Sequence, residues 1–218
     1  MKISLEELHQ REMLQLSKER GRDPNPVQWR WSPFDIRIYD VMLHVAYDHL
    51  SAREPHRLRD ISESSAFSIW EAGSGIGTKL YLAKNKYLMT EYGFEYEMDY
   101  IEAAHELDVK CEQRDLSDLD DQPSWEVPDV VYVARPFKDD VFEKRWEMLV
   151  QDRMHPGAVL IQSFKAARPY SWQCLYHGTF RGVYVKPFPS RPEPSDMVKA
   201  ISLSFRYRNT ARGGKPAG

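Results

Sequence analysis

The stretch WEAGSGIGTKLYLA, residues 70–83, places three glycines within five positions, between an apolar run and a segment of helical character. Glycine allows close approach of the backbone to a ligand, and a helix N-terminus presents free N–H groups and a partial positive charge. The stretch therefore predicts a strand, a turn and a helix that together hold a nucleotide-like ligand. The alternative is that Gly73, Gly75 and Gly77 only tighten a turn.

Two common nucleotide-binding motifs fit this turn poorly. A P-loop requires GxxxxGK[ST], whereas the pair Thr78 and Lys79 stands in the reverse order. The dinucleotide fingerprint GxGxxG requires a small residue at its third glycine position. That position is Thr78 when counted from Gly73 and Leu80 when counted from Gly75, so neither register suits a dinucleotide.

The composition is that of an ordinary globular protein. The 218 residues carry a formal net charge of -3, with 42% hydrophobic and 29% charged residues, which favours neither disorder nor a strongly basic nucleic-acid scaffold. Cys111 and Cys174 show no metal-ligand spacing, so we expect no metal site. The sequence has no apolar run of about 20 residues and no signal-peptide core at its start, so we expect no membrane partner and a cytoplasmic location.

The pattern of apolar and polar residues divides the chain into three parts. Residues 1–62 predict a helical extension, with amphipathic helices at 4–20 and 34–49. The apolar side of the first helix is expected to carry Leu5, Leu8, Met13, Leu14 and Leu16. Residues 63–209 predict an α/β domain. Residues 210–218 are polar and Gly-rich and predict a disordered tail.

Short apolar runs alternate with helical patterns in the central part, which predicts a mostly parallel sheet with helices on both faces. The expected strands lie at 67–72, within 87–96 and centred on 93–96, and at 108–116, 129–137 and 157–164. The expected helices run through Lys84, at 98–107 and at 141–154. Two further β-rich segments, 180–188 and 200–208, predict an antiparallel pair that closes the sheet.

The pattern E-x-G-x-G-x-G at residues 71–77 resembles the first motif of the class I S-adenosylmethionine-dependent methyltransferases. The resemblance extends over residues 65–207. An acidic residue at the tip of the second strand is matched by Glu95, and a polar position after the third strand is matched by Asp115. The closing antiparallel pair also matches this Rossmann-like fold, and the dinucleotide-binding fold normally lacks it.

The resemblance implies S-adenosyl-L-methionine as the cofactor. Glu71 would hold the methionyl ammonium, Glu95 would accept both ribose hydroxyls, and Asp115 would accept from the adenine amino group. The cofactor-binding residues implied in this way are Glu71, Gly73, Ser74, Gly75, Gly77, Glu95, Tyr96, Asp115 and Leu116. The alternatives are a solvated charge at a strand end for Glu95 and the cap of a helix or turn for Asp115.

The loop after the fourth expected strand reads ARPFKDD, residues 134–140. Methyltransferases of this class that act on amino groups often carry [DNS]PP[YFW] there, and Ala134 stands at the polar position. A protein or small-molecule acceptor is therefore favoured over a nucleobase, with nucleic acid as a minority alternative. Arg135 is a candidate catalytic residue that would hold an anionic substrate or the cofactor carboxylate. Its alternative is a salt bridge to Asp139 or Asp140.

The helical extension at 1–62 is expected to act as a lid, as such segments do in related enzymes. Its aromatic residues Trp31, Phe34 and Tyr39 would shape the acceptor pocket, and Tyr39 is the second candidate catalytic residue. The alternative is that these aromatic side chains pack in the core.

The expected function is an S-adenosylmethionine-dependent methyltransferase, an enzyme of the transferase class. The fold alone does not disclose the acceptor. A non-catalytic S-adenosylmethionine-binding or regulatory module and an aminopropyl transferase stay open as alternatives. An oxidoreductase that uses a nicotinamide or flavin cofactor is disfavoured by Thr78 and by the closing antiparallel pair.

Overall fold

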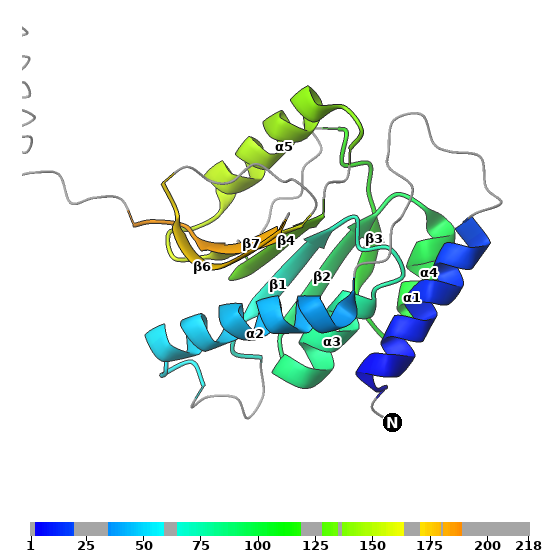
Figure 1. Cartoon of the computed structure of the whole chain (residues 1–218), viewed down its shortest axis with the longest axis horizontal. Coiled ribbons are helices and arrows are strands. Elements are labelled where there is room, and N and C mark those ends of the chain that lie inside the picture. The colour runs from blue at the N-terminus through cyan, green and yellow to red at the C-terminus, as the bar shows by residue number, and fades with distance from the viewer. Residues whose placement is uncertain are drawn as a thin grey trace, which may run out of the picture. The chain divides into compact units, whose positions relative to one another are not determined.

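The computed structural model describes residues 3–19, 35–58, 65–118, 128–134, 137–163, 171–179 and 181–188 (Figure 1). The chain divides into a unit at residues 1–187, which holds every described helix and strand, and a unit at 188–218. The strand expected at 200–208 and the tail expected at 210–218 lie outside the described residues.

The described strands form one mixed sheet in the order β3-β2-β1-β4-β5-β7-β6. They are β1 (Ser68–Ala72), β2 (Thr90–Glu95), β3 (Cys111–Gln113), β4 (Val130–Ala134), β5 (Val159–Ser163), β6 (Gln173–Gly178) and β7 (Arg181–Val185). The pairs among β1 to β5 are parallel, and β7 is antiparallel to both β5 and β6. Because β1 and β2 are parallel neighbours, their carboxyl ends meet at one edge of the sheet, as Figure 1 shows.

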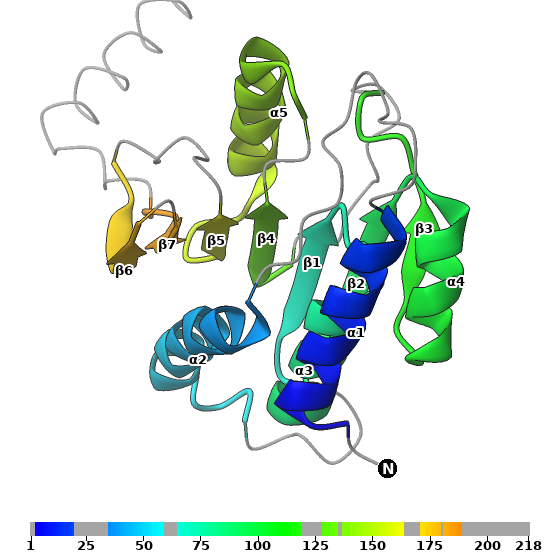
Figure 2. The ribbon, with the colours of Figure 1, turned by 45° about the vertical axis from the view of Figure 1, so that its right-hand side comes forward.

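Helices cover both faces of the sheet. One face carries α1 (Leu5–Glu19), α2 (Ile36–Arg53), α3 (Thr78–Tyr87) and α4 (Met98–Glu106), and the other carries α5 (Asp140–Arg153), which Figure 2 shows apart from α2 and α3 across the sheet. Each face of the sheet has its own cluster of buried hydrophobic side chains. The first core lies between the sheet and the helices α1 to α4 and includes Ile69, and the second core lies between the sheet and α5 and includes Trp70 and Ala72. A strand buried on both faces is mostly apolar, and β1, β4 and β5 are buried along nearly their whole length, with Glu71, Gln162 and Ser163 as buried polar exceptions.

The predicted fold class is confirmed: the domain is α/β with a mostly parallel sheet and an antiparallel closing hairpin. Two details differ from the prediction. The expected third strand at 108–116 is only Cys111–Gln113, because the chain turns at Asp115, whose carboxylate accepts the N–H of Ser117 at 2.8 Å. The partner of β7 is β6, which the sequence analysis did not predict, because this edge strand lacks a continuous apolar pattern.

Helix α1 forms where it was expected, but its buried face differs. The prediction placed Met13 and Leu14 on the apolar side, whereas their side chains are 45% and 60% exposed. The buried residues are Leu8, Glu12 and Gln15, which share one face at the spacing i, i+4, i+7. A carboxylate and an amide therefore face inward, where an apolar stripe was predicted.

Three general features concern possible partners. None of the helices in the described ranges combines the length and the apolar character of a membrane span. The same ranges contain no group of three His, Cys, Asp or Glu side chains that could hold a metal ion. Cys111 and Cys174 are free thiols, and burial raises the pKa of Cys111 to about 11, so this thiol is protonated at neutral pH.

A charged network ties the start of the sheet to the end of α2. Asp129 accepts two hydrogen bonds from Arg57, at 2.6 and 3.0 Å, and two from the backbone N–H and hydroxyl of Ser68, at 2.8 and 3.1 Å. His155 Nε2 lies 3.8 Å from the same carboxylate. Burial alone would raise the pKa of Asp129, but His155, Arg57 and Ser68 outweigh it and hold this pKa below its ordinary value.

We expect Asp129→Asn to lower the free energy of unfolding at pH 7 by about 2 to 3 kcal/mol, because charge-assisted hydrogen bonds are lost. The folded-state pKa of Asp129 is lowered, so its stabilisation is present above the ordinary carboxyl value and is lost as pH falls. Urea unfolding should therefore show a gap between the two proteins that shrinks toward pH 2. The exposed Asp152→Asn is the matched control, and an equal effect of both substitutions would contradict the role given to Asp129.

Candidate functional site

The glycine turn, residues 73–77, joins the end of β1 to the start of α3. Gly73, Gly75 and Gly77 have φ angles of 67°, 54° and 75°, in the left-handed region that glycine adopts without strain. The N–H groups of Gly73 and Ser74 donate to the carbonyl of Phe94 at 2.8 and 3.0 Å, which fastens the turn to β2. The shape of the backbone therefore requires glycine here.

Packing adds a second requirement at Gly77. A Cβ at this position would lie 2.6 Å from Val109 Cγ2 and 2.9 Å from Ala104 Cβ, both of which belong to buried side chains. Ala104 lies on α4, and Val109 lies just before β3. The α4 region therefore packs directly on the glycine turn.

We expect Gly77→Ala to lower the free energy of unfolding by about 2 kcal/mol or more, because the new Cβ is both strained at this φ and in collision with buried groups. Equilibrium urea unfolding measures the change. Gly178→Ala is the control, since Gly178 has no positive φ and its nearest neighbour is Cγ of the long Arg181 side chain at 3.1 Å. Indistinguishable midpoints for the two variants would refute the packing role of Gly77.

Glu95, the last residue of β2, is buried and directs its carboxylate at the glycine turn. Its Oε2 accepts the N–H of Gly75 at 2.8 Å, and its Oε1 accepts the N–H groups of Tyr96 at 2.7 Å and Glu97 at 3.2 Å. Burial raises the pKa of Glu95, although the three N–H donors oppose the rise. The structure thus brings Glu95 into contact with a turn that lies 20 residues earlier in the chain.

Glu71, near the end of β1, belongs to a buried ion cluster that consists of Glu12, Glu71 and Lys79. Lys79 Nζ lies 3.3 Å from Glu71 Oε1 and 3.7 Å from Glu12 Oε1, and the three side chains are at most 5% exposed. Glu12 comes from α1 and also accepts a hydrogen bond from the hydroxyl of Thr78. The cluster therefore joins β1, α3 and α1 through two carboxylates and one ammonium.

The electrostatics of the ion cluster are set by burial and mutual attraction. Burial raises the pKa of Glu71 to about 7, although Lys79 lowers it. Burial also disfavours the charged form of Lys79, but Glu71 and Glu12 outweigh this effect and raise the pKa of Lys79. Lys79 is therefore charged at neutral pH, whereas the protonation of Glu71 responds to small changes around it.

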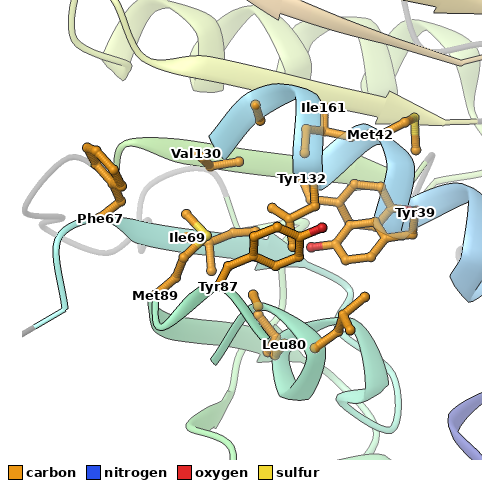
Figure 3. Close-up of a cluster of buried hydrophobic side chains, with 14 of the residues drawn as sticks. Tyr39, Met42, Phe67, Ile69, Leu80, Tyr87, Met89, Val130, Tyr132 and Ile161 are labelled. Carbon is orange, nitrogen blue, oxygen red and sulfur yellow. The ribbon is translucent and has the colours of Figure 1, made fainter. Parts of the chain in front are cut away.

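Tyr39, a candidate catalytic residue from the sequence, lies in the first core below the ion cluster. Its ring packs edge-on against Tyr132 of β4 at a centroid distance of 5.0 Å, and its side chain is fully buried (Figure 3). Burial, followed by the charge of Glu71, raises the pKa of Tyr39. Among the described residues its hydroxyl has no hydrogen-bond partner. In this structure Tyr39 has the packing role that the sequence analysis gave as its alternative.

The other predicted cofactor-binding residues lie at the ends of β2 and β3 and in the glycine turn. The Asp115 side chain is exposed, and one of its oxygens caps the following turn, as the alternative expected. Leu116 is buried in the second core, and Tyr96 is 42% exposed. Ser74 is buried in the glycine turn, with its Oγ 3.1 Å from Cys111 Sγ.

The loop after β4 is described only in part. Arg135, and the aromatic residues Trp31 and Phe34 of the expected lid, lie outside the described residues. Phe137 is fully buried, with ring centroids 4.7 Å from Phe142 and 5.9 Å from Trp146. The aromatic end of the ARPF sequence is therefore a core anchor of this loop.

Sequence reasoning missed Glu12, and it considered Thr78 and Lys79 only as mismatches to other motifs. A signal was present in α1, because Leu8, Glu12 and Gln15 recur at helical spacing on one face. A glutamate on the face marked by a buried leucine predicts a buried partner of opposite charge. That partner, Lys79, is 67 positions away, so local sequence could not identify it.

Comparisons with known proteins add the following. No protein-family model and no curated protein matches the chain. Among solved structures it is similar to an RNA methyltransferase from Salinibacter ruber in complex with S-adenosyl-L-homocysteine, at 18% identity over 74% of this chain and 97% of that one, with a TM-score of 0.49. It is also similar to a putative methylase from Haemophilus influenzae, at 15% identity over 66% of this chain and 99% of that one, with a TM-score of 0.45.

A third similar structure is an S-adenosylmethionine-bound amino pentose methyltransferase from Micromonospora echinaspora. The identity is 14% over 76% of this chain, the TM-score is 0.42, and the match spans 64% of that longer chain. The strand order, rather than these scores, carries the assignment of the fold. A seven-stranded mixed sheet of this order, observed here in the described residues, is typical of the class I S-adenosylmethionine-dependent methyltransferase fold.

Proposed function

We propose that this protein is an S-adenosylmethionine-dependent methyltransferase that binds its cofactor at the glycine turn. The observation that carries the proposal is the contact of the Glu95 carboxylate with the N–H of Gly75, at the carboxyl edge of a sheet of the class I order. Ligands of open α/β sheets bind in the crevice at this edge. A carboxylate there suits a ligand with a ribose diol and no phosphate at this position.

The hydrogen-bond capacity of Glu95 fits this role. A carboxylate has about four acceptor positions, and three are taken by N–H groups. One ribose hydroxyl therefore finds an unused position on Glu95. The second hydroxyl replaces the longest of the three contacts, the 3.2 Å bond from the N–H of Glu97.

The remaining cofactor residues take the roles that the family resemblance implies. Glu71 provides negative charge for the methionyl ammonium. Within the described residues its carboxylate contacts the ammonium of Lys79 at 3.3 Å, which leaves acceptor positions for a further polar partner. Asp115 and Leu116 serve the adenine, and the short backbone of the glycine turn leaves room for the ligand.

The chemistry of methyl transfer places modest demands on the protein. When bound, S-adenosylmethionine supplies a methyl group on an electrophilic sulfonium. The chain then has to align an acceptor and exclude water. Arg135 and the helical extension at 1–62, acting as a lid, are the proposed acceptor-side elements, with the methyltransferase domain at 63–209.

A protein or a small molecule is the proposed acceptor. Ala134 offers no polar side chain where methyltransferases of amino groups carry one, and Phe137 is committed to the core. The proposed compartment is the cytoplasm, which agrees with the two free thiols Cys111 and Cys174.

Isothermal titration with S-adenosylhomocysteine and with NADH tests the function. We expect the wild-type chain to bind the former and not the latter. We expect Glu95→Gln to weaken S-adenosylhomocysteine binding by about 1.5 to 3 kcal/mol, because a charged acceptor is lost from the ribose diol. Glu102→Gln, an exposed change of equal charge on α4, should bind normally. Binding of NADH alone, or unchanged affinity in Glu95→Gln, would overturn the proposal.

A further inference from the structure

The N-terminus of α3 lacks a capping side chain of its own. Its N-cap residue is Gly77, which makes no side-chain cap, and its first turn holds no acidic residue. The first N–H groups of a helix have no partner within the helix, and the helix dipole adds a partial positive charge at this end. The start of α3 therefore attracts an anion, immediately after the glycine turn.

Glu12 of α1 supplies an anion at this place. Its carboxylate is 1% exposed and accepts a hydrogen bond from the hydroxyl of Thr78, the first residue of α3. The same carboxylate lies 3.7 Å from the ammonium of Lys79. Thr78 and Lys79 thus present a hydroxyl and a cation, both buried, to a carboxylate that belongs to a distant segment.

The charges of the ion cluster are unequal. Glu12 and Glu71 share the single ammonium of Lys79, which lies closer to Glu71. The second oxygen of Glu12 has no hydrogen bond within the described residues. Burying a carboxylate with incomplete partners costs free energy, and part of this cost stays uncompensated at Glu12 because its second oxygen has no hydrogen bond within the described residues and Lys79 lies 3.7 Å away.

Helix α1 is also lightly attached. Leu8 is its only apolar side chain among the described residues that is buried, whereas Met13 and Leu14 are exposed. Ile3, two residues before α1, donates its N–H to the hydroxyl of Tyr81 of α3 at 2.9 Å. By contrast, α2 buries six side chains. The apolar contacts of α1 are therefore fewer than those of α2, and apart from Leu8 they come from partly buried side chains such as Leu5.

We infer that Thr78 and Lys79 form a binding subsite for the carboxylate of an α-amino acid group, and that Glu12 occupies this subsite until the ligand displaces it. The inference rests on the proposed function, since the amino-acid end of the cofactor is the ligand group that carries this carboxylate. Helix α1 is then an internal competitor of cofactor binding. Glu71 and Lys79 remain as the counter-charges for the two ends of the amino-acid group.

Titration with two ligands that differ in this group tests the subsite. S-adenosylhomocysteine carries the amino-acid carboxylate, and 5′-methylthioadenosine lacks it. We expect Glu12→Gln to bind S-adenosylhomocysteine about tenfold more tightly than wild type, because the competing carboxylate is removed. The affinity for 5′-methylthioadenosine should stay unchanged. Glu6→Gln, an exposed change of equal charge on the same helix, should bind both ligands as wild type does.

Hydrogen exchange of the wild-type chain gives a readout that needs no variant. We expect S-adenosylhomocysteine to speed exchange in α1 while it slows exchange in the glycine turn. Slower or unchanged exchange in α1, or equal affinity of wild type and Glu12→Gln for a ligand that both bind, overturns the subsite alone. Absence of S-adenosylhomocysteine binding in every protein overturns the proposed function and the subsite together.

Discussion

A buried ammonium needs carboxylates, and Lys79 of α3 has two, one from β1 and one from α1. Glu71 comes from the first strand of the domain, Lys79 from the helix after the glycine turn, and Glu12 from the N-terminal helix. Removing Lys79 would leave two buried carboxylates without a counter-charge where water does not reach. The ion cluster therefore joins α1 to α3 in this structure, next to the proposed cofactor site.

The glycine turn adds a steric constraint to this electrostatic one. Its backbone curls so that Gly75 meets the carboxylate of Glu95, and the missing side chain of Gly77 lets α4 pack against it. Strand, turn and helix are consequently held from one side by the ion cluster and from the other by β2 and α4. The glycine turn is therefore held in its shape without a ligand, which lowers the cost of ordering it on binding.

The sequence predicted what depends on local pattern. Strands β1, β4 and β5 are buried on both faces, so most of their residues are apolar and the sequence pattern predicts them. The glycine turn and Glu95 were found because their spacing matches a family motif. Edge strand β6 carries only a weak pattern because it is half exposed.

Long-range contacts account for what the sequence could not disclose. In the sequence, Glu12 is indistinguishable from the other charged residues of a surface helix. Only the contact with Lys79 in the structure identifies it as a buried acid. The ring of Tyr39 suits a pocket as well as a core, and only the packing against Tyr132 decides between them. The direction of a side chain is settled by elements that meet in space, not by neighbours in the chain.

The central claim is that the glycine turn, Glu95 and the start of α3 bind S-adenosylmethionine. A crystal structure of the complex with S-adenosylhomocysteine tests it most directly. The account predicts the ribose hydroxyls within hydrogen-bond distance of Glu95, the amino-acid carboxylate on Thr78 and Lys79, and Glu12 withdrawn from both. A ligand bound elsewhere, with Glu95 contacting only backbone N–H groups, would contradict it.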